Sequence, residues 1–122
     1  MPKVLLLQFA TDPERAARQA ILQNLGVTLA VAEPRWPTFF DEVAAERPDV
    51  IVIAGSLFPT HAIEAARYLG DGFNTRNIPV IVVDVADKNL ERARSSAPRA
   101  RIVDGVQLAD AVRAALTKPI AT

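Results

Sequence analysis

The sequence predicts an α/β fold in which five parallel strands alternate with five helices. Short, continuous apolar runs rich in β-branched residues recur along the chain, as expected of parallel strands that are covered on both faces. Segments with apolar residues at helical spacing lie between these runs, and the connections are short. This alternation implies right-handed crossovers and one sheet with helices on both faces.

The strand pattern is clearest in three apolar runs, at residues 4–7, 50–54 and 80–83. Two weaker runs, at residues 27–31 and 101–103, are expected to complete the sheet. The three clear runs are continuous and do not alternate, so we expect these strands to be buried on both faces.

Helical spacing predicts helices over residues 13–25, 37–46, 60–69, 88–96 and 106–116. Asp12 is expected to cap the first helix, with Pro13 at its first position and Ala17 and Leu22 on its inner face. Gly70 is expected to end the third helix.

The length of 122 residues and an apolar content of 50% are enough for one domain, which we expect to span residues 1–122. The chain has no cysteine, which excludes disulfides, thiolate metal sites and a cysteine nucleophile. Fourteen basic residues balance fourteen acidic ones, so we expect neither nucleic acid nor a membrane surface as a partner. The apolar run near the N-terminus is too short for a signal peptide, and we expect a cytoplasmic protein.

Two phrases in the sequence point beyond the general α/β class. Arg47-Pro48-Asp49 precedes the apolar run at residues 50–53, and Ile78-Pro79 precedes the run at residues 80–83. These phrases resemble the entries to the third and fourth strands of bacterial response-regulator receiver domains. Their separation and the order of the elements fit such a domain over nearly the whole chain. The resemblance implies a flavodoxin-like fold with strand order 2-1-3-4-5.

Receiver chemistry depends on a phosphoryl-accepting aspartate, an acidic pair that binds Mg²⁺, a hydroxyl residue and a lysine. The resemblance puts Ala54 at the acceptor position, and Ala has no nucleophilic oxygen. It puts Gln8 and Phe9 at the acidic pair, where neither can replace a carboxylate as a ligand for a hard cation. The hydroxyl and lysine positions fall on Asp84 and Asp104. We therefore expect a degenerate site that cannot be phosphorylated and holds no metal or cofactor.

Asp84 and Asp104 follow neighbouring strands, so they could form a cation or ligand site. The alternative is structural: Asp84 caps a loop and Asp104 caps the last helix, with Gln107 completing a box-like pattern. The single histidine, His61, has no second histidine or cysteine with which to bind a transition metal, and we expect it to be a solvated residue at a helix start.

The resulting hypothesis is a phosphorylation-independent pseudo-receiver, not an enzyme, that binds proteins in bacterial signalling or regulation. Receivers commonly signal through their fourth helix, fifth strand and fifth helix. On that face the candidate partner-binding residues are Arg92, Arg94, Arg101 and Arg113, which favour an acidic protein surface, and a homodimer is also open.

Two further alternatives remain at this point. Trp36 either covers the edge of the core or projects as an interaction anchor. In a different class of function, a small ligand would bind at the carboxyl ends of the strands, ringed by Gln8, Phe9, Ser56, Asp84 and Asp104.

Overall fold

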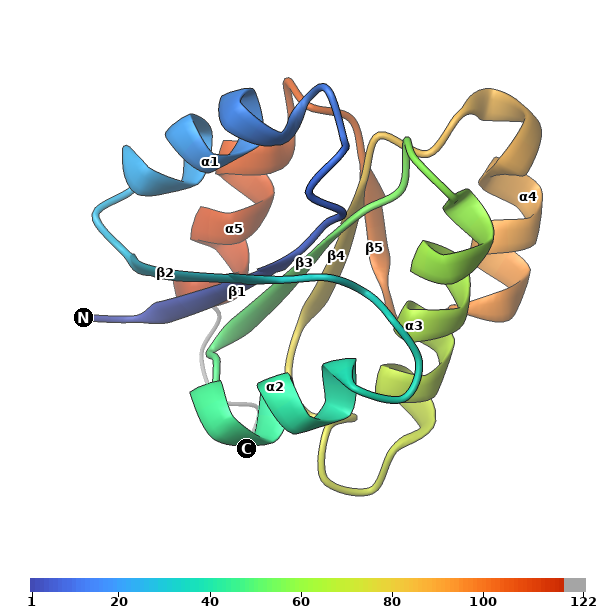
Figure 1. Ribbon diagram of the computed structural model, residues 1–122, viewed down its shortest axis with the longest axis horizontal. Helices are drawn as coiled ribbons and strands as arrows, with labels where there is room; N and C mark the ends of the chain where they lie inside the picture. Colours follow the sequence, from blue (N-terminus) through green and yellow to red (C-terminus); the bar gives the residue numbers. More distant parts are fainter. Residues whose placement is uncertain (118–122) are drawn as a thin grey trace.

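A computed structural model describes residues 1–117 and places all five strands in one parallel sheet with the order β2-β1-β3-β4-β5, which confirms the predicted topology (Figure 1). The strands are β1 (Lys3–Leu7), β2 (Thr28–Ala32), β3 (Val50–Ala54), β4 (Val80–Val83) and β5 (Arg101–Val103). Each strand differs from its predicted bounds by no more than one residue at either end. The prediction of a single domain over residues 1–122 extends five residues beyond the described part.

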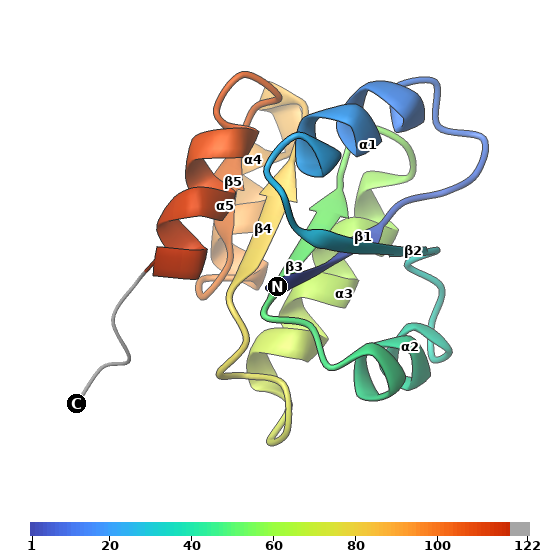
Figure 2. The same cartoon turned by 90° about the vertical axis from the view of Figure 1, so that its left-hand side faces the viewer.

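Helices cover both faces of the sheet, as the alternating pattern predicted. They are α1 (Arg15–Gln23), α2 (Phe39–Glu46), α3 (Pro59–Asp71), α4 (Asp87–Ser96) and α5 (Leu108–Thr117). In both views α1 and α5 lie together on one face, and α2, α3 and α4 lie on the other (Figures 1 and 2).

The sheet separates two hydrophobic cores, because successive side chains of a strand point to opposite faces. In β1, Leu5 and Leu7 belong to the core under α2 and α3, whereas Val4 and Leu6 belong to the core under α1 and α5. The central strand β3 is buried on both faces, and Val52 has no exposed surface. This burial explains why the strands read as continuous apolar runs.

Several helix boundaries differ from the prediction: α2 and α5 each begin about two residues later than expected, at Phe39 and Leu108, and the ends of α1 and α3 also differ. Helix α1 begins at Arg15, and Asp12 remains in the preceding loop, so Asp12 does not cap the helix and Pro13 is not its first residue. Helix α3 continues through Gly70 to Asp71. Gly70 is buried there, and the side chain of Arg99 passes over it at van der Waals distance from where a Cβ would lie. A Cβ at this position would make only ordinary contacts, so Gly70 is an interior residue of the helix and does not end it.

The inner face of α1 also differs from the prediction. Ala17 is exposed, and the buried residues of the helix are Arg18 and Leu22. Within the part of the chain that the structure describes, no helix is both long enough and apolar enough to cross a membrane.

Candidate functional site

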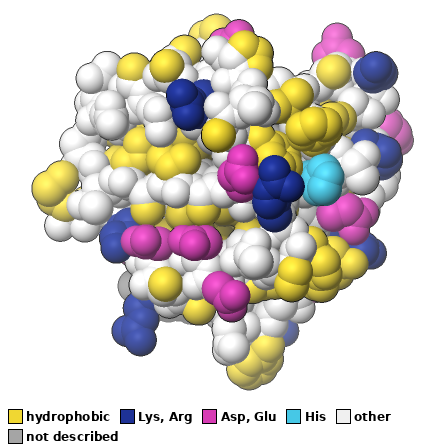
Figure 3. Space-filling model, in the orientation of Figure 1, with side chains coloured by type: hydrophobic (Ala, Val, Ile, Leu, Met, Phe, Trp, Pro, Cys, Tyr) yellow, Lys and Arg dark blue, Asp and Glu magenta, His cyan; other side chains and the backbone are white. Residues whose placement is uncertain are grey.

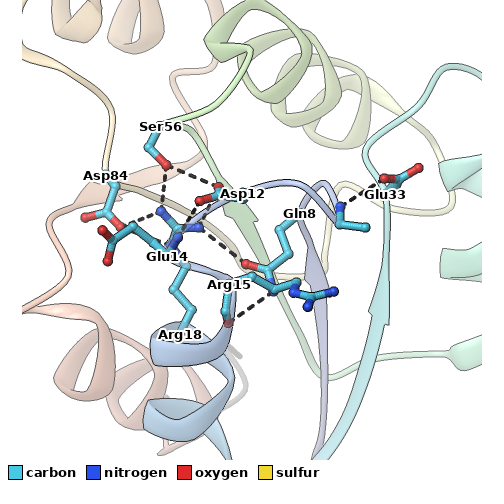
Figure 4. A network of polar contacts seen from close by, with 9 residues as sticks. Gln8, Asp12, Glu14, Arg15, Arg18, Glu33, Ser56 and Asp84 are labelled. Carbon is cyan, nitrogen blue, oxygen red and sulfur yellow. Dashed lines mark hydrogen bonds and ion pairs between the residues drawn. The ribbon is translucent and has the colours of Figure 1, made fainter.

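A buried arginine side chain occupies the centre of the polar site at the carboxyl ends of the strands. Arg18, on α1, is only 2% exposed. Around its guanidinium lie Gln8 after β1, Asp12 in the β1–α1 loop, Ser56 in the β3–α3 loop and Asp84 directly after β4 (Figure 4). Open α/β sheets place their sites at this edge, so three strand ends converge on one side chain.

The guanidinium has five N–H groups, and its three nitrogens make five hydrogen bonds. Nε donates to Oδ2 of Asp84 at 3.0 Å, and Nη2 donates to the same oxygen at 2.8 Å. Nη1 donates to Oδ2 of Asp12 at 2.8 Å and to Oε1 of Gln8 at 3.3 Å. The fifth bond runs from Nη2 to Oγ of Ser56, at 2.7 Å. The donor capacity of Arg18 is thus fully used.

The loops that carry these acceptors are themselves held by local hydrogen bonds. Asp12 accepts the backbone N–H of Glu14 through Oδ1 at 2.9 Å, which leaves Oδ2 for Arg18 and for the hydroxyl of Ser56. Asp84 adopts a left-handed backbone with φ of 65°, a conformation that aspartate tolerates better than most residues. The fold therefore orients both carboxylates toward the guanidinium.

Burial raises the pKa of the Asp12 carboxyl, but the hydrogen bond from Arg18 and the N–H of Glu14 oppose it and hold the pKa below the ordinary value. The charge of Arg18 and the hydroxyl of Ser56 act in the same direction. Asp12 is therefore a carboxylate at neutral pH, and it balances the buried guanidinium at an ion-pair distance of 2.8 Å.

The residues at the predicted degenerate phosphorylation-site positions lie in different surroundings. Ala54 ends β3 and is 2% exposed, and Phe9 is 4% exposed. The ring of Phe9 lies edge-on against Phe58 and His61, with centroids 5.1 Å and 5.6 Å away. Gln8 and Asp84 join the Arg18 network, but Phe9 belongs to an aromatic cluster beside it. The position that corresponds to the phosphoryl acceptor of receivers is therefore occupied by the methyl group of Ala54.

Asp104 does not join the network. Its Oδ1 accepts the backbone N–H of Gln107 at 3.0 Å, and Oε1 of Gln107 accepts the N–H of Asp104 at 3.1 Å. These reciprocal bonds form the box-like pattern that the sequence predicted at the start of the last helix. Asp84 lies nearby, since a Cβ on Gly105 would approach its Oδ1 within 3.4 Å. The carboxylate of Asp84 nevertheless accepts its hydrogen bonds from Arg18.

Trp36 packs against the edge of the core and is also well exposed, and its role as an interaction anchor stays a prediction. It is 58% exposed, yet its ring lies over Tyr68 with centroids 4.3 Å apart and contacts the rings of Phe39 and Phe40. A groove of about 250 Å³ runs from Trp36 to His61 along α3. Figure 3 shows hydrophobic side chains gathered beside the single histidine on this side of the molecule.

The four arginines predicted to bind a partner are all exposed, but their surroundings differ. Arg113 pairs with Asp110 one turn earlier in α5, at 3.1 Å, and Arg92 donates to the hydroxyl of Thr60 at 3.3 Å. Arg94 lies in the last turn of α4, and Arg101 begins β5. Among the described residues, neither Arg94 nor Arg101 has an ion-pair partner.

The residues at this edge do not fit the Mg²⁺ ion that receiver chemistry uses. Mg²⁺ needs oxygen ligands in octahedral geometry, usually including carboxylates. Here the two carboxylates that face the site, Asp12 and Asp84, both accept hydrogen bonds from Arg18, whose positive charge lies between them. Within residues 1–117, no group of three or more histidine, cysteine or acidic side chains is placed to hold a metal.

Arg18 and Asp12 are the functional residues that sequence reasoning missed. Asp12 could be read as a helix cap, and an arginine inside an amphipathic helix is normally assigned to its exposed face. One signal was present: Arg18 lies four residues before Leu22, on the face of the helix that turns inward. The sequence therefore allowed a second interpretation, in which Arg18 is buried and faces the polar residues at the strand ends.

No protein-family model and no curated protein matches the sequence, but solved structures share its fold. The signal receiver domain of a signal transduction histidine kinase from Syntrophus aciditrophicus aligns with a TM-score of 0.74 at 23% identity, covering 100% of this chain and 96% of that one. The signal receiver domain of a modulated diguanylate cyclase from Desulfovibrio desulfuricans gives 0.71 at 19% identity, covering 97% and 95%.

A third similar structure is the receiver domain of a sensor histidine kinase from Pseudomonas aeruginosa, with a magnesium ion coordinated in its active-site cleft. It aligns with a TM-score of 0.61 at 19% identity, covering 98% of this chain and 87% of that one. These similarities extend over almost the full length of each chain. The protein described here thus has the fold of signal receiver domains, with an arginine at the centre of its strand-end site.

Proposed function

We propose that this chain is a pseudo-receiver that acts without phosphorylation, as a protein-interaction module in bacterial signalling or regulation. The observation that carries the proposal is the position of Arg18. Its guanidinium lies between Asp12 and Asp84 at the edge where a receiver would bind its cation, next to a strand that ends in Ala54. The proposal assigns no catalytic activity to the chain.

A built-in cation changes what such a site can do. In a phosphorylatable receiver, metal and phosphoryl group are exchangeable, so the loops around them can respond to a signal. Arg18 is covalently part of the chain, and it connects the loops after β1, β3 and β4 through charge-assisted hydrogen bonds. The proposed module therefore keeps one arrangement of its loops and presents its surfaces constantly.

The magnesium ion in the Pseudomonas aeruginosa receiver gives this proposal a point of comparison. The hydrogen-bonded guanidinium supplies positive charge at the strand ends without an exchangeable ion. The burial of Phe9 and Ala54 favours the interaction module over a small-ligand pocket at the same edge.

The proposed partner surface is the face made by α4, β5 and α5, with Arg92, Arg94, Arg101 and Arg113 as its cations. An acidic partner surface would complement these side chains and would accelerate association. Trp36, in the β2–α2 connection, offers an aromatic anchor because more than half of its surface is exposed.

The absence of phosphorylation is tested with acetyl phosphate and Mg²⁺, followed by intact-mass measurement. We expect no mass increase, because Ala54 offers no oxygen and both nearby carboxylates are hydrogen-bonded to Arg18. A stoichiometric phosphoryl adduct on Asp12 or Asp84 would contradict the proposal.

The interaction role is tested by affinity capture from the native host, with each captured protein then purified for a direct binding measurement. We expect a double substitution of Arg92 and Arg94 by Ala to weaken direct binding, and more so at low salt. Arg15→Ala is the matched control, since Arg15 is exposed on α1, away from this face. Equal loss in both variants would show that the proposed face is wrong.

A further inference from the structure

A second cavity lies at the opposite end of the sheet, where β4 and β5 begin. It has a volume of about 450 Å³, within the size range of pockets that hold small molecules. Three arginines line it: Arg76 from the α3–β4 connection, Arg99 from the α4–β5 connection and Arg101 at the start of β5. Three cations from two connections thus reach one hollow.

No acidic side chain lines this cavity. Within residues 1–117, none of the three arginines takes part in an ion pair or donates a side-chain hydrogen bond to a protein acceptor. This contrasts with Arg18, whose donors are all used inside the protein. Guanidinium groups without anionic partners at a concave surface are suited to an external anion.

Two of the three arginines contact neighbouring groups: Arg99 through its aliphatic stem and Arg76 through an aromatic ring. The stem of Arg99 lies over Gly70 of α3, with its Cβ and Cδ 3.5 Å from the site of a Gly70 Cβ. The guanidinium of Arg76 lies 5.3 Å from the ring centre of Phe73. The packing of the Arg99 stem on α3 restricts that side chain before any ligand arrives, which lowers the entropy lost on binding.

The rest of the lining is mainly small and apolar. Ala111, Ala114 and Ala115 of α5 face the cavity from one side, and Ala66 of α3 faces it from the other. Such walls leave room for a flat or branched hydrocarbon body but provide few hydrogen-bond partners for it. The lining is therefore amphipathic, with cations near apolar walls.

We infer that this cavity binds a small organic anion, with a phosphate or carboxylate group held by Arg76, Arg99 and Arg101 and an apolar body held against the alanines. Planar guanidinium groups bind either oxyanion in a bidentate manner. The inference concerns the end of the sheet opposite the Arg18 site; it shares Arg101 with the proposed partner surface, but its small-probe test is separate from the test with protein partners.

The test uses 1-naphthyl phosphate and 1-naphthylacetate as probes, with uncharged 1-naphthol as the reference. Binding is followed by two-dimensional amide NMR of the full chain. We expect at least one anion to bind with a dissociation constant below about 1 mM, and naphthol to bind at least about tenfold more weakly. The shifted amides should include Asn77, Ala100 and Arg101, which line the cavity. The two anionic probes distinguish phosphate from carboxylate recognition.

The variant for this test replaces both Arg99 and Arg101 by Gln. We expect at least about a tenfold loss of anion affinity, because two charge-assisted contacts are removed. Arg15→Gln is the matched control, since Arg15 is an exposed arginine of α1 outside the cavity lining, and it should bind like the parent. Ala114→Leu narrows the hollow from an exposed helix position and should weaken the naphthyl probes while leaving the fold intact.

Failure of both anions to bind at millimolar concentration would overturn the inference. So would amide shifts confined to other parts of the chain, or equal binding by the parent and the double variant. An unchanged amide spectrum of the free variants shows that they are folded, so a loss of binding then reports on the cavity.

Discussion

The two ends of the parallel sheet use arginine in opposite ways. At the carboxyl ends, Arg18 is 2% exposed and lies between two carboxylates. At the amino ends, Arg76, Arg99 and Arg101 are exposed around a cavity without an acidic lining residue. Removing a buried cation leaves buried anions unpaired, whereas removing an exposed one mainly changes what the surface can bind. The difference separates an internal structural ion pair from a surface prepared for an external anion.

The largest expected effect is the loss of Arg18. Arg18→Met keeps the apolar stem but leaves Asp12 buried without its counter-charge, which should lower the free energy of unfolding by about 3 to 5 kcal/mol. Arg101→Met, at the other end of the sheet, should change it by no more than about 0.5 kcal/mol. Urea unfolding of the three proteins measures both values. Similar free energies of unfolding for Arg18→Met and Arg101→Met would contradict the distinction between the two ends of the sheet.

Asp12→Asn should have the next largest effect, about 1.5 to 3 kcal/mol at neutral pH. The substitution retains an oxygen that can accept the hydrogen bond from Arg18. It removes the negative charge of the carboxylate, whose Oδ2 lies 2.8 Å from Nη1 of Arg18. Asp110→Asn is a suitable control because the Asp110–Arg113 pair is exposed. If both substitutions cost the same, burial of the Arg18 network would have no energetic consequence.

The pH dependence of stability sharpens this comparison. In the folded protein the pKa of Asp12 lies below its ordinary value of 3.8, so the carboxylate form is favoured by folding. The resulting stabilisation is fully present above the ordinary pKa and is lost as the pH falls through the lower folded pKa. We therefore expect the stability gap between the parent and Asp12→Asn to shrink below about pH 4. Unfolding curves from pH 7 to pH 2 test this, and a gap that widens in acid would contradict it.

The smallest expected effect concerns Asp104, which follows a strand end but lies outside the network. Asp104→Ala should cost about 1 kcal/mol, because the N–H of Gln107 loses its side-chain acceptor. Asp104→Asn should be nearly neutral, since Asn caps about as well as Asp. Thermal melts measure both variants. A large loss in Asp104→Asn would mean that the charge of Asp104 matters beyond the helix start.

The fold was largely predictable because its signals are local and repeated. Buried parallel strands produce continuous runs such as residues 50–54, and their alternation with helices restricts the topology. The absence of an acceptor at Ala54 could also be read directly. The distance between Arg18 and Asp84 could not, because those residues are 66 positions apart and meet only when α1 packs beside the end of β4.

Asp12 shows a second limit of sequence reasoning. An aspartate followed by proline and glutamate fits a helix start, yet the structure uses Asp12 to close a turn onto Glu14 and to face Arg18. The two uses share the same local chemistry, and only the tertiary position of Arg18 distinguishes them. The gathering of Arg76 with Arg99 and Arg101 was equally hidden, since it depends on two connections that meet at one end of the sheet.

The stacking of Trp36 on Tyr68 has a practical consequence for experiments on this protein. Trp36 is the only tryptophan of the chain, so its fluorescence comes from one known place, the groove along α3. With 58% of its surface exposed, its emission should lie toward long wavelengths and be accessible to iodide quenching. A partner that covers the groove would shift the emission to the blue, whereas an anion in the cavity beside Arg101 would leave it unchanged. One intrinsic optical signal can therefore report which of two surfaces a binding partner occupies.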